Sequence, residues 1–366
     1  MNKKSLLLCI CLCLLASLIG CTIDLNQPTG ATPGSQAQPT SPASTTSAGT
    51  SWGGLNLNGR LVYSTYAVAE IPPATRIQML NLATSENKTI FRVTRNAWVY
   101  YLSVAPDEKS LVMAYAPPSE PNTEPVTSLY TLPLEDGGEP QLLLDPNLSS
   151  DRYIQVEWSP DGKYIYFVHY NLQQQPANET VPHFNIFRMS YPDGSPEKII
   201  DHGFWPRLSA DSSKLVYISL DPVSGVNELF VANADGSDAH EIPLSDPVAS
   251  QILDAPIFSP DGTAILFSAP TPAAAYEPNW LDRVIGVQIA QAHNVSSDWW
   301  SVPIAGGTVT RLTHLQTIKL FASISPDKKH IASESGEGIF VMDPDGSNLT
   351  QLLLEPTISS PLNWIP

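Results

Sequence analysis

The sequence has almost no cysteine and few basic residues. All four cysteines lie within the first 21 positions, at Cys9, Cys11, Cys13 and Cys21. The rest of the chain therefore has no disulfide, no thiolate-bound metal and no cysteine nucleophile. Lys and Arg number 19 against 36 Asp and Glu, which gives a formal charge of −17. Nucleic-acid binding needs clustered basic side chains to contact phosphates, so the sequence predicts no nucleic-acid partner.

Long apolar runs and several catalytic signatures are also missing. The longest apolar stretch, 6–19, is too short to cross a bilayer comfortably. No Gly-rich phosphate-binding loop occurs, and no α/β domain is present to hold a serine nucleophile at a sharp turn. We therefore expect no cofactor and assign no catalytic residue.

The N-terminus has the parts of a bacterial export signal. Lys3 and Lys4 precede the apolar run, which ends in Leu18-Ile19-Gly20-Cys21. This ending resembles the lipobox of bacterial lipoproteins, which implies cleavage before Cys21 and attachment of lipid to its sulfur. We expect residues 1–20 to be a signal peptide, and Cys21 to anchor an extracytoplasmic protein in the membrane, at the cell surface or in the periplasm. An ordinary secretory signal and an uncleaved helical anchor are the alternatives.

A linker follows the anchor. Residues 26–51 contain only Asn, Gln, Pro, Thr, Gly, Ala and Ser. Such a segment cannot bury enough apolar surface to offset the entropy lost on ordering. We predict a lipidated Cys and disordered linker over 21–51, which holds a folded head, 52–366, clear of the bilayer.

The head repeats one unit. A turn of the Ser-Pro-Asp type recurs about every 50–65 residues, at 105–107, 159–162, 209–211, 259–262 and 325–327. A short β-rich run follows each turn, and then a second hairpin whose turn contains Asp-Gly or Gly-Gly. Units of this length with four antiparallel strands are typical of propeller blades.

Both ends of the head contribute to one further blade. Segments 59–63, 76–82 and 88–93 match three of the four strands, and 361–366 matches the missing one. Pairing between the two ends would close the ring and remove open sheet edges. The sequence thus predicts an all-β fold, a six-bladed β-propeller of four-stranded antiparallel blades closed by the C-terminal strand.

The Ser-Pro-Asp-Gly turn, the β-rich run after it and the Asp-Gly-Ser hairpin resemble the TolB-like β-propeller repeat family. The resemblance covers about residues 55–366 and implies the propeller fold. TolB itself carries an additional N-terminal α/β domain, and we expect a linker and a lipid anchor in its place here. The partners of TolB are therefore not expected for this chain.

The connections between strands differ in length on the two faces of such a propeller. The long ones, 117–126, 171–184 and 269–298, all fall on the face opposite the Ser-Pro-Asp turns. Binding residues concentrate on long loops held by a rigid scaffold. We therefore expect binding on the long-loop face and a structural role for the turn aspartates.

The strand before each turn alternates between packed and channel-lining positions. This register places Glu157 and Arg207 at equivalent channel positions of neighbouring blades, with Tyr101, Gln155 and Trp205 nearby. Polar and aromatic side chains in a concave site suit a ligand, so these five are candidate ligand residues at the channel mouth. The alternative is an ion pair that only satisfies a wet channel.

Aromatic and basic side chains also lie in or beside the 269–298 insertion. Exposed, they would suit contacts with a protein or glycan, and the alternative is a small core within the insertion. The candidate partner-contact residues are Tyr276, Trp280, Arg283, Trp299 and Trp300.

We expect a monomeric head that binds or scaffolds a protein or a cell-envelope polymer without catalysis. A polysaccharide-acting lyase or hydrolase with its site at the channel mouth is the alternative, and a purely structural envelope component is a third possibility. Some related sugar lyases hold a metal there through histidines. The histidines assigned to that face have no tight ligand spacing, so we predict no metal; they are His169, His183, His202, His293 and His314.

Overall fold

A computed structural model of the 366-residue chain describes most of the head. The described residues are 52, 54–67, 74–93, 97–118, 126–135, 137–146, 150–171, 183–248, 251–270, 295–354 and 361–366. The predicted signal peptide, Cys21 and linker lie outside these ranges. Within them, no helix is long and apolar enough to cross a membrane.

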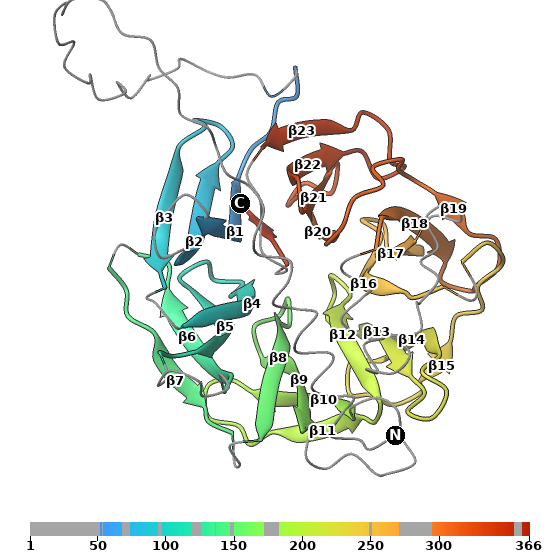
Figure 1. Ribbon diagram of the computed structural model, residues 1–366, viewed down its shortest axis with the longest axis horizontal. Helices are drawn as coiled ribbons and strands as arrows, with labels where there is room; N and C mark the ends of the chain where they lie inside the picture. The colour runs from blue at the N-terminus through green and yellow to red at the C-terminus, as the bar shows by residue number, and fades with distance from the viewer. Residues whose placement is uncertain are drawn as a thin grey trace, which may run out of the picture. The chain divides into compact units, whose positions relative to one another are not determined.

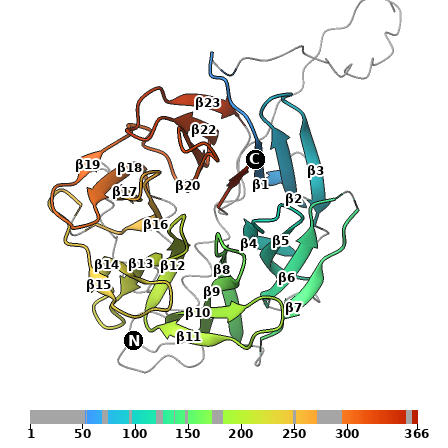
Figure 2. The same cartoon turned by 180° about the vertical axis from the view of Figure 1, so that it is seen from behind.

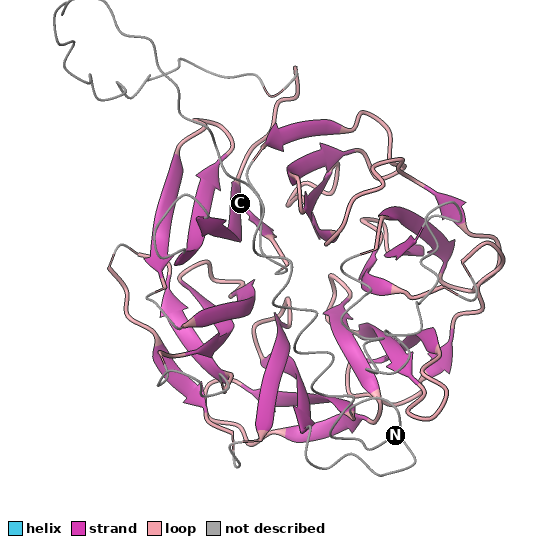
Figure 3. Ribbon diagram, viewed as in Figure 1, coloured by secondary structure: helices cyan, strands magenta, loops and turns pink. Residues whose placement is uncertain are grey.

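Six four-stranded antiparallel sheets surround a common centre as the blades of a propeller (Figure 1). The same ring is seen from behind in Figure 2. Figure 3 shows strands joined by loops and turns, with no helix among the described residues. This architecture confirms the predicted fold class.

In five blades the strands follow the order of the sequence from the centre outwards, and in the first blade β24 is the inner strand. The first blade holds β24 (Asn363–Ile365), β1 (Arg60–Ala67), β2 (Ala74–Asn81) and β3 (Asn87–Arg92). The second and third hold β4 (Trp98–Val104), β5 (Ser110–Ala116), β6 (Ser128–Pro133) and β7 (Gln141–Leu144), then β8 (Asp151–Trp158), β9 (Tyr164–Asn171), β10 (Phe184–Ser190) and β11 (Glu197–Ile200). The fourth holds β12 (Gly203–Leu208), β13 (Lys214–Leu220), β14 (Asn227–Asn233) and β15 (His240–Glu241). The fifth and sixth hold β16 (Asp254–Phe258), β17 (Ala264–Pro270), β18 (Ser297–Pro303) and β19 (Thr310–Arg311), then β20 (Phe321–Ile324), β21 (Ile331–Ser335), β22 (Gly338–Met342) and β23 (Thr350–Leu353).

The ring closes by pairing the two ends of the head. β24 lies antiparallel to β1, with Leu61 opposite Trp364 and Val62 opposite Asn363. Trp364 is 6% exposed, and its Nε1 donates a hydrogen bond of 2.9 Å to the Asn58 carbonyl. The C-terminal strand thus supplies the inner strand of the first blade, as predicted.

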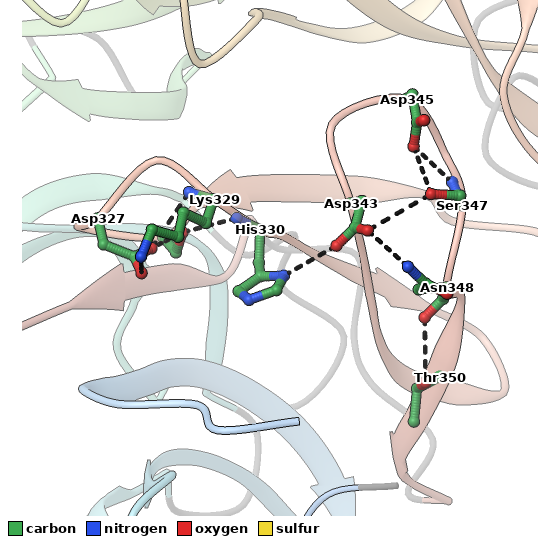
Figure 4. A network of polar contacts seen from close by, with 9 residues as sticks. Asp327, Lys329, His330, Asp343, Asp345, Ser347, Asn348 and Thr350 are labelled. Carbon is green, nitrogen blue, oxygen red and sulfur yellow. Dashed lines mark hydrogen bonds and ion pairs between the residues drawn. The ribbon is translucent and has the colours of Figure 1, made fainter. Parts of the chain in front are cut away.

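A polar network supports the sixth blade next to this closure (Figure 4). His330 Nδ1 lies 3.2 Å from Asp343 Oδ1, and Asn348 Nδ2 donates to the other oxygen of Asp343 at 2.7 Å. The His330 ring also stacks on Trp364, with centroids 6.4 Å apart and planes 12° apart. The two turns of the sixth blade are therefore tied to each other and to the closing strand.

Side chains from both faces of the blades pack between neighbouring sheets. The residue before the first turn position is buried in four blades, at Val104, Trp158, Phe258 and Trp364. Full burial of a large apolar side chain contributes about 1.5–3 kcal/mol to stability. The repeated apolar position therefore holds each blade to its neighbours, as the alternation in the sequence predicts.

The Ser-Pro-Asp turns share one hydrogen-bond pattern. In the third blade Ser159 Oγ donates to Asp161 Oδ1 at 2.7 Å and accepts from the Tyr164 amide at 2.9 Å. Asp161 Oδ1 also accepts from the Lys163 amide. The residue after the aspartate has a left-handed backbone, with φ of 72° at Gly162, where glycine carries no steric cost. The Ser and Asp are turn formers, and the pattern recurs at 209–214, 259–264 and 325–330.

Four neighbouring inner strands contain a register shift that the alternating pattern did not reveal. The shifts lie within β4, β8, β12 and β16, and the last three share one backbone feature. The bulged residues Gln155, Trp205 and Ala255 have left-handed φ values of 51°, 58° and 45°. Such backbones are uncommon outside glycine, and bulges re-aim the side chains that follow them.

Candidate functional site

The predicted channel pair forms an ion pair between neighbouring blades. Arg207 Nη1, from β12, donates to Glu157 Oε2, from β8, at 2.7 Å. Each side chain is 16% exposed. Ser103 Oγ, from the second blade, lies 3.5 Å from the same carboxylate oxygen.

Arg207 also reaches across the fifth blade. Its Nη2 donates to the Ala322 carbonyl of the sixth blade at 3.1 Å. The equivalent channel position of the fifth blade is Ile257, which has no polar side-chain atom. One guanidinium therefore links the third, fourth and sixth blades.

Similar bonds join the other blades at this level. Ser103 Oγ accepts from the Trp158 amide at 2.9 Å, and Ser323 Oγ accepts from the Trp364 amide at 3.0 Å. Asn363 Oδ1 accepts from the Val104 amide at 2.9 Å. Ser103, Ser323 and Asn363 occupy the same channel-lining register as Glu157 and Arg207, but a role was assigned from the sequence only to the charged pair. The short polar side chains of the serines and the asparagine were the sequence feature that could have indicated bonds between blades.

Burial raises the pKa of Glu157, and the adjacent Arg207 and Ser103 oppose that rise. Desolvation disfavours the charged carboxylate, whereas the guanidinium favours it. The charge of Glu157 thus depends on Arg207 remaining in contact.

Aromatic rings close the channel one layer deeper. The centroid of the Trp205 ring lies 5.5 Å from that of Tyr101 and 5.2 Å from that of Phe321. Gln155 Oε1 accepts from the Trp205 amide at 2.7 Å. Burial raises the pKa of the Tyr101 hydroxyl. The void beside Trp205 and Phe321 measures about 10 Å³, at the lower limit for one water molecule.

Above this aromatic layer a cavity of about 780 Å³ opens on the Ser-Pro-Asp turn face. Glu157 and Arg207 line its inner part, and Pro160, Ala210 and Pro260 of three turns line its rim. We call this cavity the funnel. It opens opposite the long-loop face that loop lengths favoured, because the aromatic layer lies on the other side of the ion pair. Most of the long loops fall outside the described residues.

A second cavity of about 660 Å³ adjoins the funnel. The two share four lining residues, Ser259, Pro260, Asp261 and Lys328. The second cavity continues between the fifth and sixth blades as far as Asp345. The turn face therefore carries an extended groove that begins at the centre of the ring.

The structure brings together the five candidate ligand residues. Glu157 and Arg207 lie in the funnel, whereas Tyr101, Gln155 and Trp205 form the layer beneath it. Gln155 and Trp205 are 7% and 3% exposed, so they support the site and offer little surface to a ligand.

The structure corrects the placement of two candidate partner-contact residues. Trp299 and Trp300 belong to β18 and are 0% and 4% exposed. Trp299 Nε1 donates to Ser333 Oγ at 2.7 Å, and Arg311 lies over the Trp300 ring. They form blade core, because both faces of a blade are covered by its neighbours. Tyr276, Trp280 and Arg283 lie outside the described residues.

The histidines form small separate contacts. His169 Nε2 lies 3.1 Å from Asp151 Oδ1, and the rings of His183 and His202 meet at 4.8 Å. In the part of the chain that the structure describes, no three His, Cys, Asp or Glu residues gather as metal ligands. His293 lies outside that part.

Comparisons with known proteins point to the fold. No protein-family model matches the chain, and no curated protein matches its sequence. Among solved structures, TolB from Acinetobacter baumannii has a TM-score of 0.55 at 17% identity, over 84% of this chain and 67% of that one. A TolB-like structure from Agrobacterium tumefaciens has a TM-score of 0.54 at 15% identity, over 84% and 98%. A chain of the nidogen/laminin complex has a TM-score of 0.55 at 11% identity, over 84% and 98%. At these identities the likeness shows a shared β-propeller fold.

Proposed function

We propose that this chain is a lipid-anchored, extracytoplasmic member of the TolB-like repeat family. In this proposal its propeller is a non-catalytic binding module for a protein or cell-envelope polymer. The observation that carries the binding role is the funnel, whose inner polar groups are fixed by bonds between blades. A preorganised concave site loses little conformational entropy when a ligand binds.

The N-terminal sequence supports the proposed location. A lipid on Cys21, followed by an uncharged linker over 26–51, would leave the head free to turn its groove toward envelope components. Several acyl chains on one residue hold a protein stably on a membrane, whereas one chain gives marginal binding. The proposed partner is therefore an envelope component within reach of the linker.

Substitution of the proposed lipid-bearing residue tests the anchor. In bacterial cells fed a labelled fatty acid, the full chain should incorporate label and sediment with membranes. Cys21→Ser should abolish labelling and leave the precursor unprocessed. Cys9→Ser is the matched control, because Cys9 would be lost with the signal peptide. Labelled, membrane-bound Cys21→Ser protein would refute the anchor.

The binding role is tested separately by crosslinking in intact cells. The full chain should recover an envelope protein or glycan, and a substitution that fills the funnel, Ala210→Trp, should reduce that recovery. Ala210 is an exposed turn residue on the rim, so the change leaves the core intact. Undiminished recovery would contradict a binding role for the funnel.

A further inference from the structure

We propose that the funnel and its adjoining groove bind an uncharged oligosaccharide. This inference rests on the proposed binding role and names the chemical class of the ligand. It follows from the charge balance of the lining, the free hydrogen-bonding capacity of the central ion pair, and the shape of the cavity.

The lining is charge-balanced in a strongly acidic protein. The chain carries 36 acidic against 19 basic residues, yet the funnel is lined by three of each, and the adjoining groove adds one acidic residue, Asp345. Those in the funnel are Glu157, Asp211, Asp261, Arg207, Lys214 and Lys328. A lining without net charge does not concentrate ions of either sign, so it favours a ligand without net charge.

The central ion pair keeps unused donors and acceptors. Among the described residues, the hydrogen bonds of Glu157 are all made by Oε2, so Oε1 of this funnel-lining residue keeps its capacity to accept. Arg207 uses two of its N–H groups, toward Glu157 and Ala322, and a guanidinium has five. The pair thus offers an acceptor and several donors side by side.

A hydroxyl group suits this arrangement better than a charged group. It can donate to Glu157 Oε1 and accept from Arg207 at once. An ammonium group would meet Arg207 as well as Glu157, and a carboxylate would meet Glu157 as well as Arg207, so the pair gives a charged group little net attraction to offset its loss of hydration. Neighbouring hydroxyls on a sugar ring supply donors and acceptors at a spacing that two adjacent planar side chains can match.

The walls and length of the cavity favour an oligomer. Apolar side chains from Leu208, Ile257 and Ile324 line the sides and can pack against the C–H faces of sugar rings. The funnel volume of about 780 Å³ lies within the range of small-molecule sites. The groove of about 660 Å³ that continues from it would accommodate further units of a linear chain.

The test compares three tetrasaccharides that differ in charge. The purified full chain, in detergent, is titrated calorimetrically with tetra-N-acetylchitotetraose, with its cationic deacetylated form, and with anionic tetragalacturonate. The neutral oligomer should bind, and both charged oligomers should bind about tenfold more weakly or worse, because a charge-balanced lining does not offset the loss of hydration of a charged ligand.

Matched variants locate the site. Ala210→Trp should abolish binding of the neutral oligomer by filling the rim. Pro106→Trp changes the corresponding turn position of the second blade, which does not line the funnel, and should leave binding unchanged. Glu157→Gln should weaken binding about tenfold, and a melting curve for each variant establishes that it is folded.

Three results would overturn the inference: tighter binding of a charged oligomer, equal binding by wild type and Ala210→Trp, or no saccharide binding. Each is distinct from failure of the proposed function. Recovery of an envelope protein by crosslinking, together with absent saccharide binding, would retain the binding role and remove the saccharide. If the labelling experiment refuted the lipid anchor, the expected saccharide affinities would be unchanged.

Discussion

Arg207 connects three blades through one side chain. Its two bonds, to Glu157 and to the Ala322 carbonyl, span the blade whose equivalent position is Ile257. Both members of the ion pair are largely desolvated, so each depends on the other. Removal of one partner would leave an uncompensated charge, whereas replacement of both by apolar groups would not.

Arg207→Met should lower the free energy of unfolding by about 2–4 kcal/mol, because Glu157 loses its counter-charge. It should also raise the pKa of Glu157 further, since Arg207 opposes the effect of burial. Adding Glu157→Leu to Arg207→Met should restore most of the lost stability. Urea unfolding at pH 7 measures the stability of the single and the double variant. A double variant less stable than the single one would contradict this account.

The Ser-Pro-Asp turns are the element that the sequence repeats most clearly. In the fourth blade, bonds from Ser209 and Ser213 to the Asp211 carboxylate lower its pKa to about 2. The carboxylate has an ordinary pKa of 3.8, which approximates its value in the unfolded chain. Because the folded pKa is the lower one, this group stabilises the fold above about pH 4. The stabilisation is lost as the pH falls from 3.8 toward 2.

Asp211→Asn should reduce stability at pH 7 by about 1 kcal/mol or less, because solvent screens an exposed turn. The difference from wild type should shrink as the pH falls from about 4 to 2. Asp193→Asn is the control, since the described structure shows no hydrogen bond to that exposed carboxylate. Chemical unfolding at several pH values measures this. A difference that persists unchanged at pH 2 would show that the carboxylate charge is not responsible.

At the scale of the whole molecule, the ring depends on one short strand. β24 contains three residues, yet it provides the inner strand of the first blade. Trp364 packs against Leu61 in one cluster, bonds to Asn58 and stacks on His330. The closing contact therefore combines apolar burial with a hydrogen bond to the segment before β1 and a ring contact with the sixth blade.

Trp364→Ala should lower the free energy of unfolding by about 3–5 kcal/mol, as expected for loss of a buried Trp. Trp98→Ala is the matched control, because Trp98 is 41% exposed on β4, and it should cost less than about 1 kcal/mol. Thermal and urea unfolding compare the two. Equal losses would mean that closure by β24 contributes no more than an ordinary surface contact.

Much of the fold could be predicted from the sequence because it is local and repeated. Turn chemistry at Ser159 and Asp161 and alternation in the strands depend on neighbouring residues, so six blades and their closure by 361–366 were accessible. The bulges at Gln155, Trp205 and Ala255 could not be predicted, because an alternation of apolar and polar residues does not show where the backbone inserts an extra residue.

The site was predicted only in part. Register alone placed Glu157 beside Arg207, since equivalent positions of adjacent blades face the same channel. It could not show that Trp205 meets Phe321 beneath them, nor that Trp299 and Trp300 are buried. Those outcomes depend on how far each side chain reaches across the ring and on what covers each blade.

The sequence by itself determined the number of blades, the strand order and the mode of closure, because short-range turn and strand preferences repeat along the chain. Only the tertiary structure decided which face the cavity opens on. That depends on contacts between residues more than 100 positions apart, such as the bond from Arg207 to Ala322, and on aromatic rings that meet across the centre and close the opposite side.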